Sequence, residues 1–526
     1  MACAAGGCSA GGSSTAAPAA PAITQLTTGE SWVEISWASV RSAASYNLYY
    51  AEVPGVDVGT SMRVTDVESP FLHSGLKNGR FYFYVLTSVN SRGESSPSEE
   101  WSVRCGSGSG GGGSGSGEEY DPQWAGVEPT EVLEIDFDQG MSQQENGSLL
   151  KEVIQGLQPG QRLEIGAGVW SIASLFSIDL AGREDAPIFI AAKAGAEVTL
   201  TRPDANQNCV NAGKGGPARY VALQGLEITG GDTALKLYDC ENLWIDRCHV
   251  HDCAGAGIAA NSADTAFLHL TRNHIHHTRG SAEGMYLGAN YSQYRMSYST
   301  IALNHVHDTY GDQGDGIEVK QGSHGNWIVE NLVHDCNYPC ILVYGTDGVD
   351  FNLVERNICY GSGDNCMQVQ GEAVVRNNLI VNGDYGFSSH DHQAASKNLV
   401  VVHNTIVNAG RAAHLQNWNG REGMVFANNV VYSRDADSIR FSSGSSGVTI
   451  QGNVVLGPVV GASSGFVFGE GLSDFVDLTW NASSLDARPS AFGALIGTAH
   501  SSFVVEIDLS GLVRSAPFES GCYEGF

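Results

Sequence analysis

Three residues whose side chains can move protons recur at intervals in short alternating segments of the sequence. Lys320 and Tyr344 each end such a segment, and His390 follows a third. A Lys or His side chain can take a proton from carbon, and a Tyr hydroxyl can give one to a leaving oxygen. Removal of the C5 proton of a uronic acid, beside its carboxylate, begins either β-elimination or epimerisation. These residue types therefore indicate acid–base chemistry as a candidate function, of which this proton removal is one example.

The segments that carry these residues alternate apolar and polar side chains and are bounded by Gly, Asn and Asp. A period of two with those boundaries predicts strands, and alternate residues of a strand point to opposite faces. The positions predicted to face inward are Leu235/Leu237, Ile258/Ala260, Met285/Leu287, Ile317/Val319, Ile341/Val343, Met367/Val369 and Phe387/Ser389.

Two columns of outward side chains follow from this alignment. The first contains Lys236, Ala259, Tyr286, Glu318, Leu342, Gln368, Ser388 and Leu415. The second contains Tyr238, Asn261, Gly288, Lys320, Tyr344, Gln370, His390 and Asn417. Stacked strands lie about 4.8 Å apart, so the polar members would form one strip that suits a long, polar polysaccharide. We predict Lys320 and Tyr344 as base and acid. The predicted substrate ligands are Tyr286, Glu318, Gln368, Gln370 and Asn417.

The alternative interpretation of Glu318 and Lys320 is a surface ion pair, worth well under about 1 kcal/mol. A carboxylate this close would also stabilise the protonated form of Lys320, which cannot act as a base. A bound sugar or a metal ion would then have to occupy Glu318.

Two further clusters have residue types that bind metal ions. Asp308, Asp312 and Asp315 lie in one Gly-rich turn with Glu283 one repeat earlier, and oxygen ligands of this kind suit Ca²⁺. The spacing matches no standard calcium loop, so solvated turn carboxylates are the alternative. His251, His276, His307 and His334 recur once per repeat; three His can hold Zn²⁺, but one residue per repeat at the same corner favours a structural stack.

A repeated Asn sets the period of the elements that must position these residues. Its intervals are 21 to 31 residues, and repeats of about 20–50 residues indicate a solenoid. Strand and turn alternate without helical patterns, which predicts the coils of a parallel β-helix. Side-chain amides at the same turn of each coil can hydrogen-bond to one another, so the Asn residues are predicted to form a structural ladder. They are Asn273, Asn304, Asn331, Asn357, Asn378, Asn404, Asn429 and Asn453.

The rest of the chain divides by composition. Residues 1–21 are rich in Ala, Gly, Ser and Pro and predict a flexible leader. Residues 22–105 contain alternating strands with the spacing of a small β-sandwich, and 106–129 form a Gly/Ser linker and connector. The β-helix is assigned to 130–526, with helical spacing at 148–157 where a solenoid needs a cap.

Particular residues also resemble known families. Trp37, the Tyr46-x-Leu48-Tyr49-Tyr50 run and the Tyr82 and Tyr84 pair resemble a fibronectin type III domain. The Gly- and Pro-bounded segments between 159 and 200 resemble the entry coils of right-handed β-helix proteins that act on polysaccharides, including lyases and mannuronan epimerases. The fold class predicted is therefore all-β: a right-handed parallel β-helix with an N-terminal fibronectin type III-like β-sandwich.

The segment Tyr385 to Asp391 resembles the Tyr-Gly-Phe-Asp-Pro-His-Asp motif of alginate C5-epimerases. The resemblance implies that Tyr385 and His390 carry proton transfers. Ser388 and Ser389 replace the acidic residue and the Pro of that motif. Asn417 stands where the family has a further carboxylate, so epimerase activity lacks two of its acids.

The net charge and composition of the chain restrict the ligands and partners that it can bind. A formal net charge of −29 argues against nucleic acid and anionic membranes as ligands. An acidic substrate would be repelled unless a local cation or metal offsets the field. No run of about 18 apolar residues exists to span a membrane. Cys340 and Cys366 hold equivalent positions in neighbouring coils, which suits either a disulfide or two packed thiols.

The N-terminal residues, with Cys3 and Cys8, resemble the region around a bacterial lipoprotein cleavage site. We therefore expect a secreted or surface-anchored bacterial protein, monomeric, with Ca²⁺ as its only candidate cofactor. The predicted function is a polysaccharide lyase or C5-epimerase on a uronate-containing glycan. The alternatives are a glycoside hydrolase, which needs two carboxylates about 5–9.5 Å apart, and a non-catalytic glycan-binding adhesin.

Overall fold

The computed structural model describes residues 17–29, 31–51, 56–76, 81–98, 100–105, 119–280, 283–491 and 493–525. The chain divides into two compact units, Met1–Gly106 and Ser107–Phe526. Most of the predicted leader, with Cys3 and Cys8, and the Gly/Ser stretch 106–118 lie outside the described residues. Within the described part of the chain, no helix has the length and apolar character needed to cross a membrane.

Unit 1 is a β-sandwich of two antiparallel sheets. One sheet has the order β1-β2-β5, and the other has the order β4-β3-β6-β7 with β8 on β6. The alternation in the sequence has a direct counterpart, because every second residue of β2 is buried. The strands are β1 Ile23–Gly29, β2 Trp32–Trp37, β3 Ser45–Ala51, β4 Met62–Val67, β5 Phe71–Ser74, β6 Phe81–Asn90, β7 Gly93–Glu94 and β8 Trp101–Arg104.

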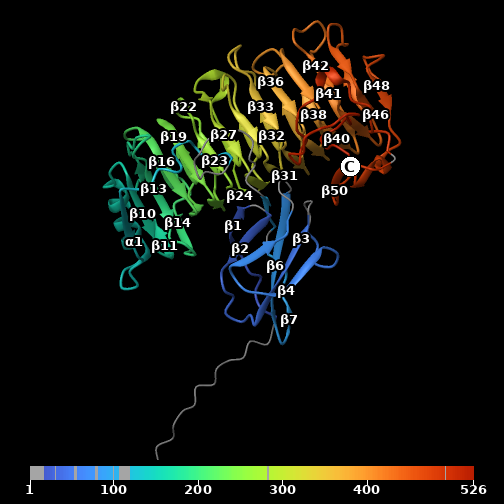
Figure 1. The fold of residues 1–526 in the computed structure, drawn as a ribbon. Coiled ribbons are helices and arrows are strands. Elements are labelled where there is room, and N and C mark those ends of the chain that lie inside the picture. Colours follow the sequence, from blue (N-terminus) through green and yellow to red (C-terminus); the bar gives the residue numbers. More distant parts are fainter. Residues whose placement is uncertain are drawn as a thin grey trace, which may run out of the picture. The chain divides into compact units, whose positions relative to one another are not determined.

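Unit 2 is a parallel β-helix whose described residues form three long sheets (Figure 1), and each coil contributes one strand to each sheet in turn. Sheet 1 contains β9 Glu131–Ile135, β10 Gln161–Ile165, β13 Ile188–Ala192, β16 Ala218–Gln224, β19 Cys240–Asp246, β22 Thr265–Ala266, β23 His269–Thr271, β26 Met296–Ser297, β27 Thr300–Ala302, β30 Trp327–Val329, β33 Asn352–Glu355, β36 Ala373–Arg376, β39 Leu399–Val402, β42 Val425–Ala427 and β45 Thr449–Gln451. Sheet 2 contains β11 Gly168–Ser171, β14 Val198–Arg202, β17 Glu227–Gly230, β20 His249–His251, β24 His274–Thr278, β28 His305–Thr309, β31 Leu332–Cys336, β34 Ile358–Tyr360, β37 Leu379–Val381, β40 Thr405–Asn408, β43 Val430–Ser433, β46 Asn453–Leu456 and β48 Phe466–Phe468. Sheet 3 contains β12 Ser177–Ile178, β15 Val210–Ala212, β18 Leu235–Leu237, β21 Ile258–Ala260, β25 Met285–Leu287, β29 Ile317–Val319, β32 Ile341–Val343, β35 Met367–Val369, β38 Tyr385–Ser389, β41 Arg411–Leu415, β44 Ile439–Phe441 and β47 Val459–Val460.

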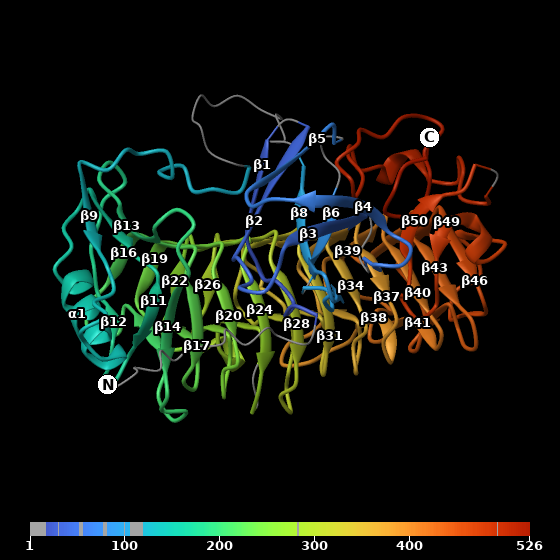
Figure 2. The same cartoon turned by 90° about the horizontal axis from the view of Figure 1, so that it is seen from below.

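The three sheets enclose one continuous apolar core. All the positions of sheet 3 predicted to face inward, from Leu235 to Ser389, are buried. Figure 2 shows the strands of successive coils lying side by side along unit 2. Cys340 and Cys366 are buried in this core as free thiols, so the described residues show the packed alternative and not the disulfide.

The Asn ladder is confirmed. Each ladder Asn from Asn273 to Asn429 donates from Nδ2 to the Oδ1 of the next, at 2.9–3.1 Å. The same Oδ1 accepts the backbone N–H of the preceding rung, as Asn331 does from Asn304 at 3.0 Å. The ladder therefore satisfies buried backbone and side-chain groups at the turn between sheets 1 and 2.

A helix covers one end of the coils. Helix α1 spans Gln143–Gln155, and its N-cap Ser142 forms a capping box with Glu145. Leu150 and Ile154 are buried against the first coils, as expected for a cap over exposed strand edges. Beyond the last coil, β49 Phe475–Leu478 and β50 Leu485–Pro489 form an antiparallel pair.

Candidate active site

Sheet 3 aligns the predicted outward column with one exception. Tyr286 pairs with Glu318, Glu318 with Leu342, and so on through Gln368 to Ser388. At the next coil the prediction is wrong: Leu415 pairs with Ser389 and is fully buried, and His414 lies beside Ser388. An apolar side chain at an inward position is stabilised by burial, so the register places His414 outside.

Lys320 directly follows β29, in the middle of the second outward column, and its side chain is buried. Its Nζ contacts Glu318 Oε1, and the two side chains are only 7% and 3% exposed. The ammonium lies 4.7 Å from the ring centroid of Tyr286 in the preceding coil and 5.3 Å from that of Tyr344 in the next. The interpretation as a solvated surface pair is therefore wrong, because both charges are removed from water.

Glu318 belongs to a cluster of three buried carboxylates. Oxygens of Glu283, Asp315 and Glu318 lie within 4.8 Å of one another. Glu283 and Asp315 occupy the same position in adjacent coils, each before a glycine that leads into the strand. Gly316 is required there, since a Cβ would lie 2.5 Å from the Cys340 carbonyl oxygen.

Burial, together with the neighbouring Glu318 charge, raises the pKa of Glu283 to about 8. Burial and the neighbouring Glu318 and Glu283 charges raise the pKa of Asp315 well above its usual value. Burial also raises the pKa of Glu318, although Lys320 acts in the opposite direction. Carboxyls that cannot all ionise together either retain protons or share a cation.

The donor set fits a hard divalent cation such as Ca²⁺, which prefers carboxylate oxygens. Asp315 Oδ1 and Glu318 Oε2 are buried and have no hydrogen-bond partner within the described residues. Such orphaned acceptors are costly unless a proton or a cation satisfies them. Glu283, Asp315 and Glu318 are therefore the residues that would hold the ion.

Of the three predicted calcium ligands only Asp315 belongs to this set, and Glu283, which the sequence places one repeat earlier, lies beside it as predicted. Asp308 lies on β28 in sheet 2, where its carboxylate accepts from His307 Nδ1 at 2.7 Å and from the Tyr310 hydroxyl at 2.6 Å. Asp312 is exposed. The residues are close in sequence but the turn separates them, so an Asp308–Asp312–Asp315 loop is not formed. The acid-Gly pair repeated in Glu283-Gly284 and Asp315-Gly316 marks the same position in adjacent coils, and the member that the predicted cluster lacked is Glu318.

Lys320, Tyr344 and His390 open into one cavity of about 350 Å³. Asp315, Glu318, Leu342, Asn365 and Gln368 also line it. Burial and the nearby Glu318 and Asp315 raise the pKa of Tyr344, so its hydroxyl is a proton donor. Burial and His392 lower the pKa of His390, which is neutral at pH 7.

Two loops from distant coils meet beside this cavity. Gln393 donates from Nε2 to Asn290 Oδ1 at 3.1 Å, and its Oε1 accepts from the Tyr291 N–H at 3.2 Å. Asn290, His392 and Gln393 are also lining residues. The Tyr344 hydroxyl lies 3.4 Å from His392 Nδ1. The two loops therefore form part of the cavity wall, next to Tyr344.

Four of the predicted catalytic and substrate-binding residues lie apart from the cavity lining. They are Tyr286, whose ring contacts Lys320, and Gln370, Asn417 and Tyr385. Gln370 is buried and uses its amide internally, accepting from the Gly345 N–H and donating to the Ala394 carbonyl. Asn417 is exposed, and its Oδ1 accepts from the Asp391 N–H at 3.2 Å. Tyr385 lies at the start of β38, where its ring contacts His414 and Arg411. The Tyr385 and His390 pair of the epimerase-like motif is therefore not assembled at one cavity.

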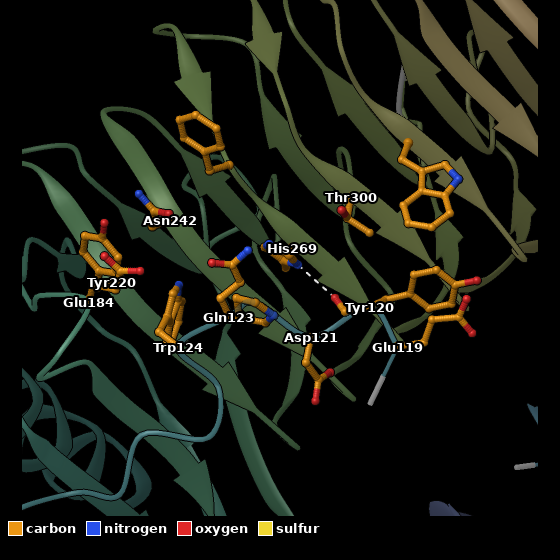
Figure 3. A pocket seen from close by; sticks show the side chains of 13 residues that line it. Glu119, Tyr120, Asp121, Gln123, Trp124, Glu184, Tyr220, Asn242, His269 and Thr300 are labelled. Carbon is orange, nitrogen blue, oxygen red and sulfur yellow. Dashed lines mark hydrogen bonds between the residues drawn. The ribbon is translucent and has the colours of Figure 1, made fainter. Parts of the chain in front are cut away.

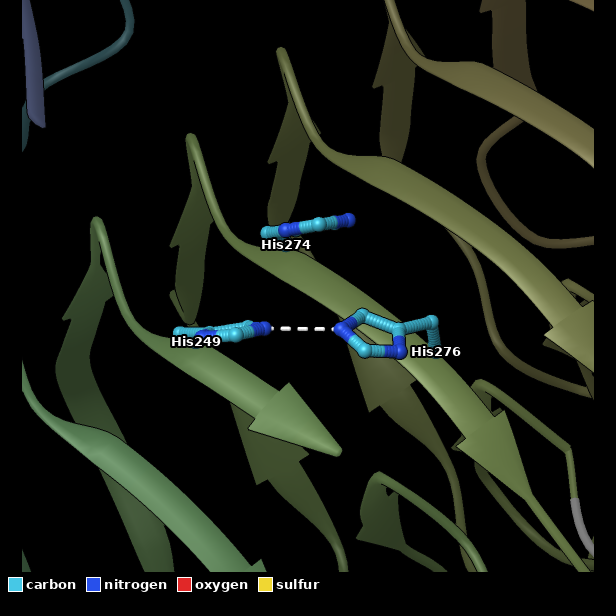
Figure 4. Close-up of side chains that lie close together, drawn as sticks. All are labelled: His249, His274 and His276. Atoms are coloured by element: carbon cyan, nitrogen blue, oxygen red, sulfur yellow. Dashed lines mark hydrogen bonds between the residues drawn. The ribbon is translucent and has the colours of Figure 1, made fainter. Parts of the chain in front are cut away.

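The histidine stack is wider than predicted. His251, His276, His307 and His334 are in register on sheet 2, as expected from their spacing. A second column, His249, His274 and His305, runs beside them. Figure 4 shows three of these rings, with His249 and His276 joined at Nε2 across 2.7 Å. The His-x-His repeat is the signal for this second column.

A second cavity, of about 530 Å³, lies between segment 119–124 and the outer face of sheet 1. Figure 3 shows Tyr120, Trp124, Tyr220 and His269 around it, with His269 Nδ1 2.9 Å from the Tyr120 carbonyl oxygen. Trp124 packs against Tyr220 with ring centroids 6.0 Å apart. These contacts attach the segment to the sheet, and none of the predicted site residues lies here.

The sequence matches a family model. The model is described as a right handed beta helix region, and residues 204–353 and 298–431 match it. A search of curated protein sequences finds no significant match.

Solved structures with similar folds include the pectate lyase Pel9A, at 14% identity and a TM-score of 0.47, covering 76% of this chain and 98% of that one. An alginate lyase from Paenibacillus sp. is 15% identical with a TM-score of 0.35, covering 64% and 98%. An Fn3-like protein from Clostridium thermocellum is 23% identical with a TM-score of 0.15, covering 17% of this chain and 92% of its own.

Proposed function

We propose that this protein is a polysaccharide lyase that cleaves a uronate-containing glycan by β-elimination at the Lys320 cavity. The observation that carries the proposal is the environment of the Lys320 amine. It lies inside a cavity, between two tyrosine rings and beside three buried carboxylates. Such glycans lie outside cells, so we further propose a secreted or surface-anchored protein.

In the proposed reaction the neutral amine of Lys320 takes the C5 proton of the uronate, and the C4–O bond breaks. The Tyr344 hydroxyl gives its proton to the leaving oxygen, leaving a C4–C5 double bond in the product. The raised pKa of Tyr344 suits this role because the hydroxyl is protonated at neutral pH. Gln368 lies in the same lining and can hydrogen-bond to the sugar.

The carboxylate cluster has two parts in this proposal. Glu283, Asp315 and Glu318 would hold a Ca²⁺-type cation, which supplies positive charge to neutralise the uronate carboxylate. When Glu318 ligates a cation, Lys320 loses the counter-ion that stabilises its ammonium form. The amine is then free to act as the base. An epimerase would share the first step, but Tyr385 lies outside the cavity lining.

A glycoside hydrolase is the second candidate, and the carboxylate cluster is what favours it. Hydrolases use two carboxyls, about 5–5.5 Å apart in retaining enzymes. Glu283, which the sequence places one repeat before Asp315, has a carboxylate oxygen within 4.8 Å of those of Asp315 and Glu318. A raised pKa such as that of Glu283 is a property of the general acid in such enzymes.

Incubation with alginates, pectins and glycosaminoglycans in the presence of Ca²⁺ separates these functions. A lyase gives a rise in ultraviolet absorbance from the unsaturated product, together with new reducing ends. New reducing ends without that absorbance indicate the hydrolase. Binding with neither signal contradicts both and supports a glycan-binding adhesin. Proton exchange at C5 followed by NMR detects an epimerase.

A further inference from the structure

The outer face of sheet 2 carries an array of imidazoles in two adjacent columns. Cα register places His249 beside His274 and His274 beside His305. The second column contains His251, His276, His307 and His334. Valine and isoleucine between the columns face the core, so the His-x-His alternation directs every imidazole to the opposite side. None of these residues lines the Lys320 cavity.

Cross-links between the columns follow one pattern. His274 and His307 approach at Nε2 to 2.8 Å, and His305 and His334 approach at Nε2 to 2.8 Å. The outer member of each pair is oriented by the carboxylate that follows it, since Nδ1 of His307 lies 2.7 Å from Asp308 and Nδ1 of His334 lies 2.7 Å from Asp335. A carboxylate at Nδ1 fixes the proton there and leaves Nε2 as an acceptor that faces the inner column.

We propose that His274, His305 and His307 form a binding site for a divalent transition-metal ion of the Zn²⁺ class. One ring nitrogen from each lies within 4.8 Å of the others, and all three residues are buried. Ligand nitrogens of a tetrahedral zinc ion are about 3.3 Å apart, so the rings would have to rotate to that spacing, and the ion would replace the His274–His307 hydrogen bond. A water molecule would complete the coordination.

The orienting carboxylate is a second observation that points to a metal. Metal-bound His residues regularly donate their other N–H to a carboxylate, which fixes the tautomer and strengthens the ligand. Asp308 does this for His307 and is itself held by the Tyr310 hydroxyl at 2.6 Å. Asp308, predicted from the sequence as a direct calcium ligand, thus becomes the partner of a nitrogen ligand.

The chemistry of imidazole selects the class of ion, and the burial and surroundings of the rings select this triad. Imidazole suits Zn²⁺, Cu²⁺ and Ni²⁺, whereas Ca²⁺ prefers oxygen. The neutral form of an imidazole is the one that binds a metal, and all three of these side chains are buried. The neighbouring triad His249–His274–His276 is less suitable, because His249 is only partly buried and lies beside His251, with ring centroids 4.3 Å apart. Burial lowers the pKa of His251, but its bonds to Glu227 and Asp252 outweigh that effect and favour its charged form, which repels a cation.

The test is calorimetric titration of the untagged, full-length, metal-stripped protein with ZnCl₂. The proposal expects saturable uptake of one ion per chain. H274Q and H307Q should weaken binding by more than about 100-fold, and D308N, which removes only the orienting charge, by about tenfold. Two variants should bind Zn²⁺ as the wild type does: H324Q, a histidine outside the array, and E283Q, which alters the oxygen cluster.

Circular dichroism establishes that each variant is folded, and H305Q replaces H274Q if that variant is not. Co²⁺ added to the wild type should give the visible bands of a tetrahedral nitrogen site. The proposal is overturned if the wild type takes up no Zn²⁺, if folded H274Q and H307Q bind as tightly as the wild type, or if E283Q alone abolishes binding. Absence of the Co²⁺ bands also counts against it.

Discussion

Lys320 is the residue on which the proposed elimination depends, and its substitution by Arg tests that role. Arg keeps the positive charge beside Glu318 and between the two rings, but it cannot lose a proton in a protein. We expect Lys320→Arg to lower the rate of formation of unsaturated product by about 10²- to 10⁴-fold, the usual contribution of a general base. The measurement is ultraviolet absorbance with the substrate identified from the panel.

Lys397→Arg is the matched control. Lys397 also pairs with a glutamate, Glu372, at 2.9 Å, but it is 46% exposed and lies outside the cavity lining. Its substitution should leave the rate within about twofold of wild type, as surface ion pairs contribute little. Equal activity in Lys320→Arg and Lys397→Arg would show that Lys320 is not the base.

Glu283 makes the stability of unit 2 depend on pH. Its pKa is raised to about 8 by burial and by Glu318, so the folded state binds a proton that the unfolded state has already lost. Its contribution is fully present below the unfolded value near 4.5 and is lost as pH rises through about 8. In EDTA, the unfolding free energy should fall across this window, by at most about 1.4 kcal/mol per pH unit for this group.

Thermal unfolding at pH 5 and pH 8 measures the effect. Glu283→Gln, which is neutral at both pH values, should show a smaller loss of Tm than the wild type between them. Ca²⁺ replaces protons at the cluster, so it should raise the wild-type Tm more at pH 8 than at pH 5. A Tm that rises with pH in EDTA, with no difference between wild type and Glu283→Gln, would exclude a buried protonated carboxyl here.

At the scale of elements, regular alternation is what made the sequence informative. The Asn ladder and the inward positions of sheet 3 follow from a strand period of two and from one stacked turn, so they were predicted correctly. The turns between the sheets were not predicted correctly, because coils of 21 to 31 residues place different lengths of chain between the strands. Asp308 and Asp315 are neighbours in sequence yet belong to sheet 2 and to the entrance of sheet 3.

The same reasoning explains the two errors around the last site coil. Leu415 and Asn417 were aligned by counting from the Asn ladder, which fixes one turn but not the length of the next. Burial of Leu415 fixes which residues of β41 face the core. Trp418, after the end of that strand, is also fully buried and donates from Nε1 to Ser389 Oγ at 3.0 Å. Side-chain packing across coils, which one strand's pattern does not contain, set the register there.

The ladder itself should be essential to stability. Asn331→Ala leaves the buried backbone N–H and Nδ2 of Asn304 without the Oδ1 that accepts from both, and it removes the donor to Asn357. Each unsatisfied buried group costs about 1–3 kcal/mol, so we expect a loss of about 3 kcal/mol or more in unfolding free energy. Urea denaturation of the full chain measures it.

Asn481→Ala is the control for the ladder substitution. Asn481 is exposed, and its Oδ1 accepts only a local bond from Ser483 at 3.0 Å. Its replacement should change the unfolding free energy by less than about 0.5 kcal/mol. If Asn331→Ala were equally mild, the ladder bonds would contribute no more than hydrogen bonds to water.

At the scale of the whole molecule, the net charge opposes the proposed substrate. A chain of formal charge −29 repels a polyuronate at distances where no single side chain acts. Salt screens this repulsion, with a Debye length of about 10 Å at 0.1 M. We therefore expect KM for the anionic glycan to fall as NaCl is raised from about 0.02 M to 0.2 M at constant, saturating Ca²⁺, while kcat changes little because the buried contacts of Lys320 are screened much less.

The direction of this salt effect separates the long-range field from the local one. Attraction by Lys320 and a bound cation acts within the cavity, whereas the repulsion belongs to the whole surface, so only the latter weakens strongly with salt. A neutral oligosaccharide that occupies the same cavity should show no dependence of its Kd on NaCl. A KM that rises with salt would mean that local positive charge attracts the substrate more strongly than the net charge of the molecule repels it. That result would contradict the prediction.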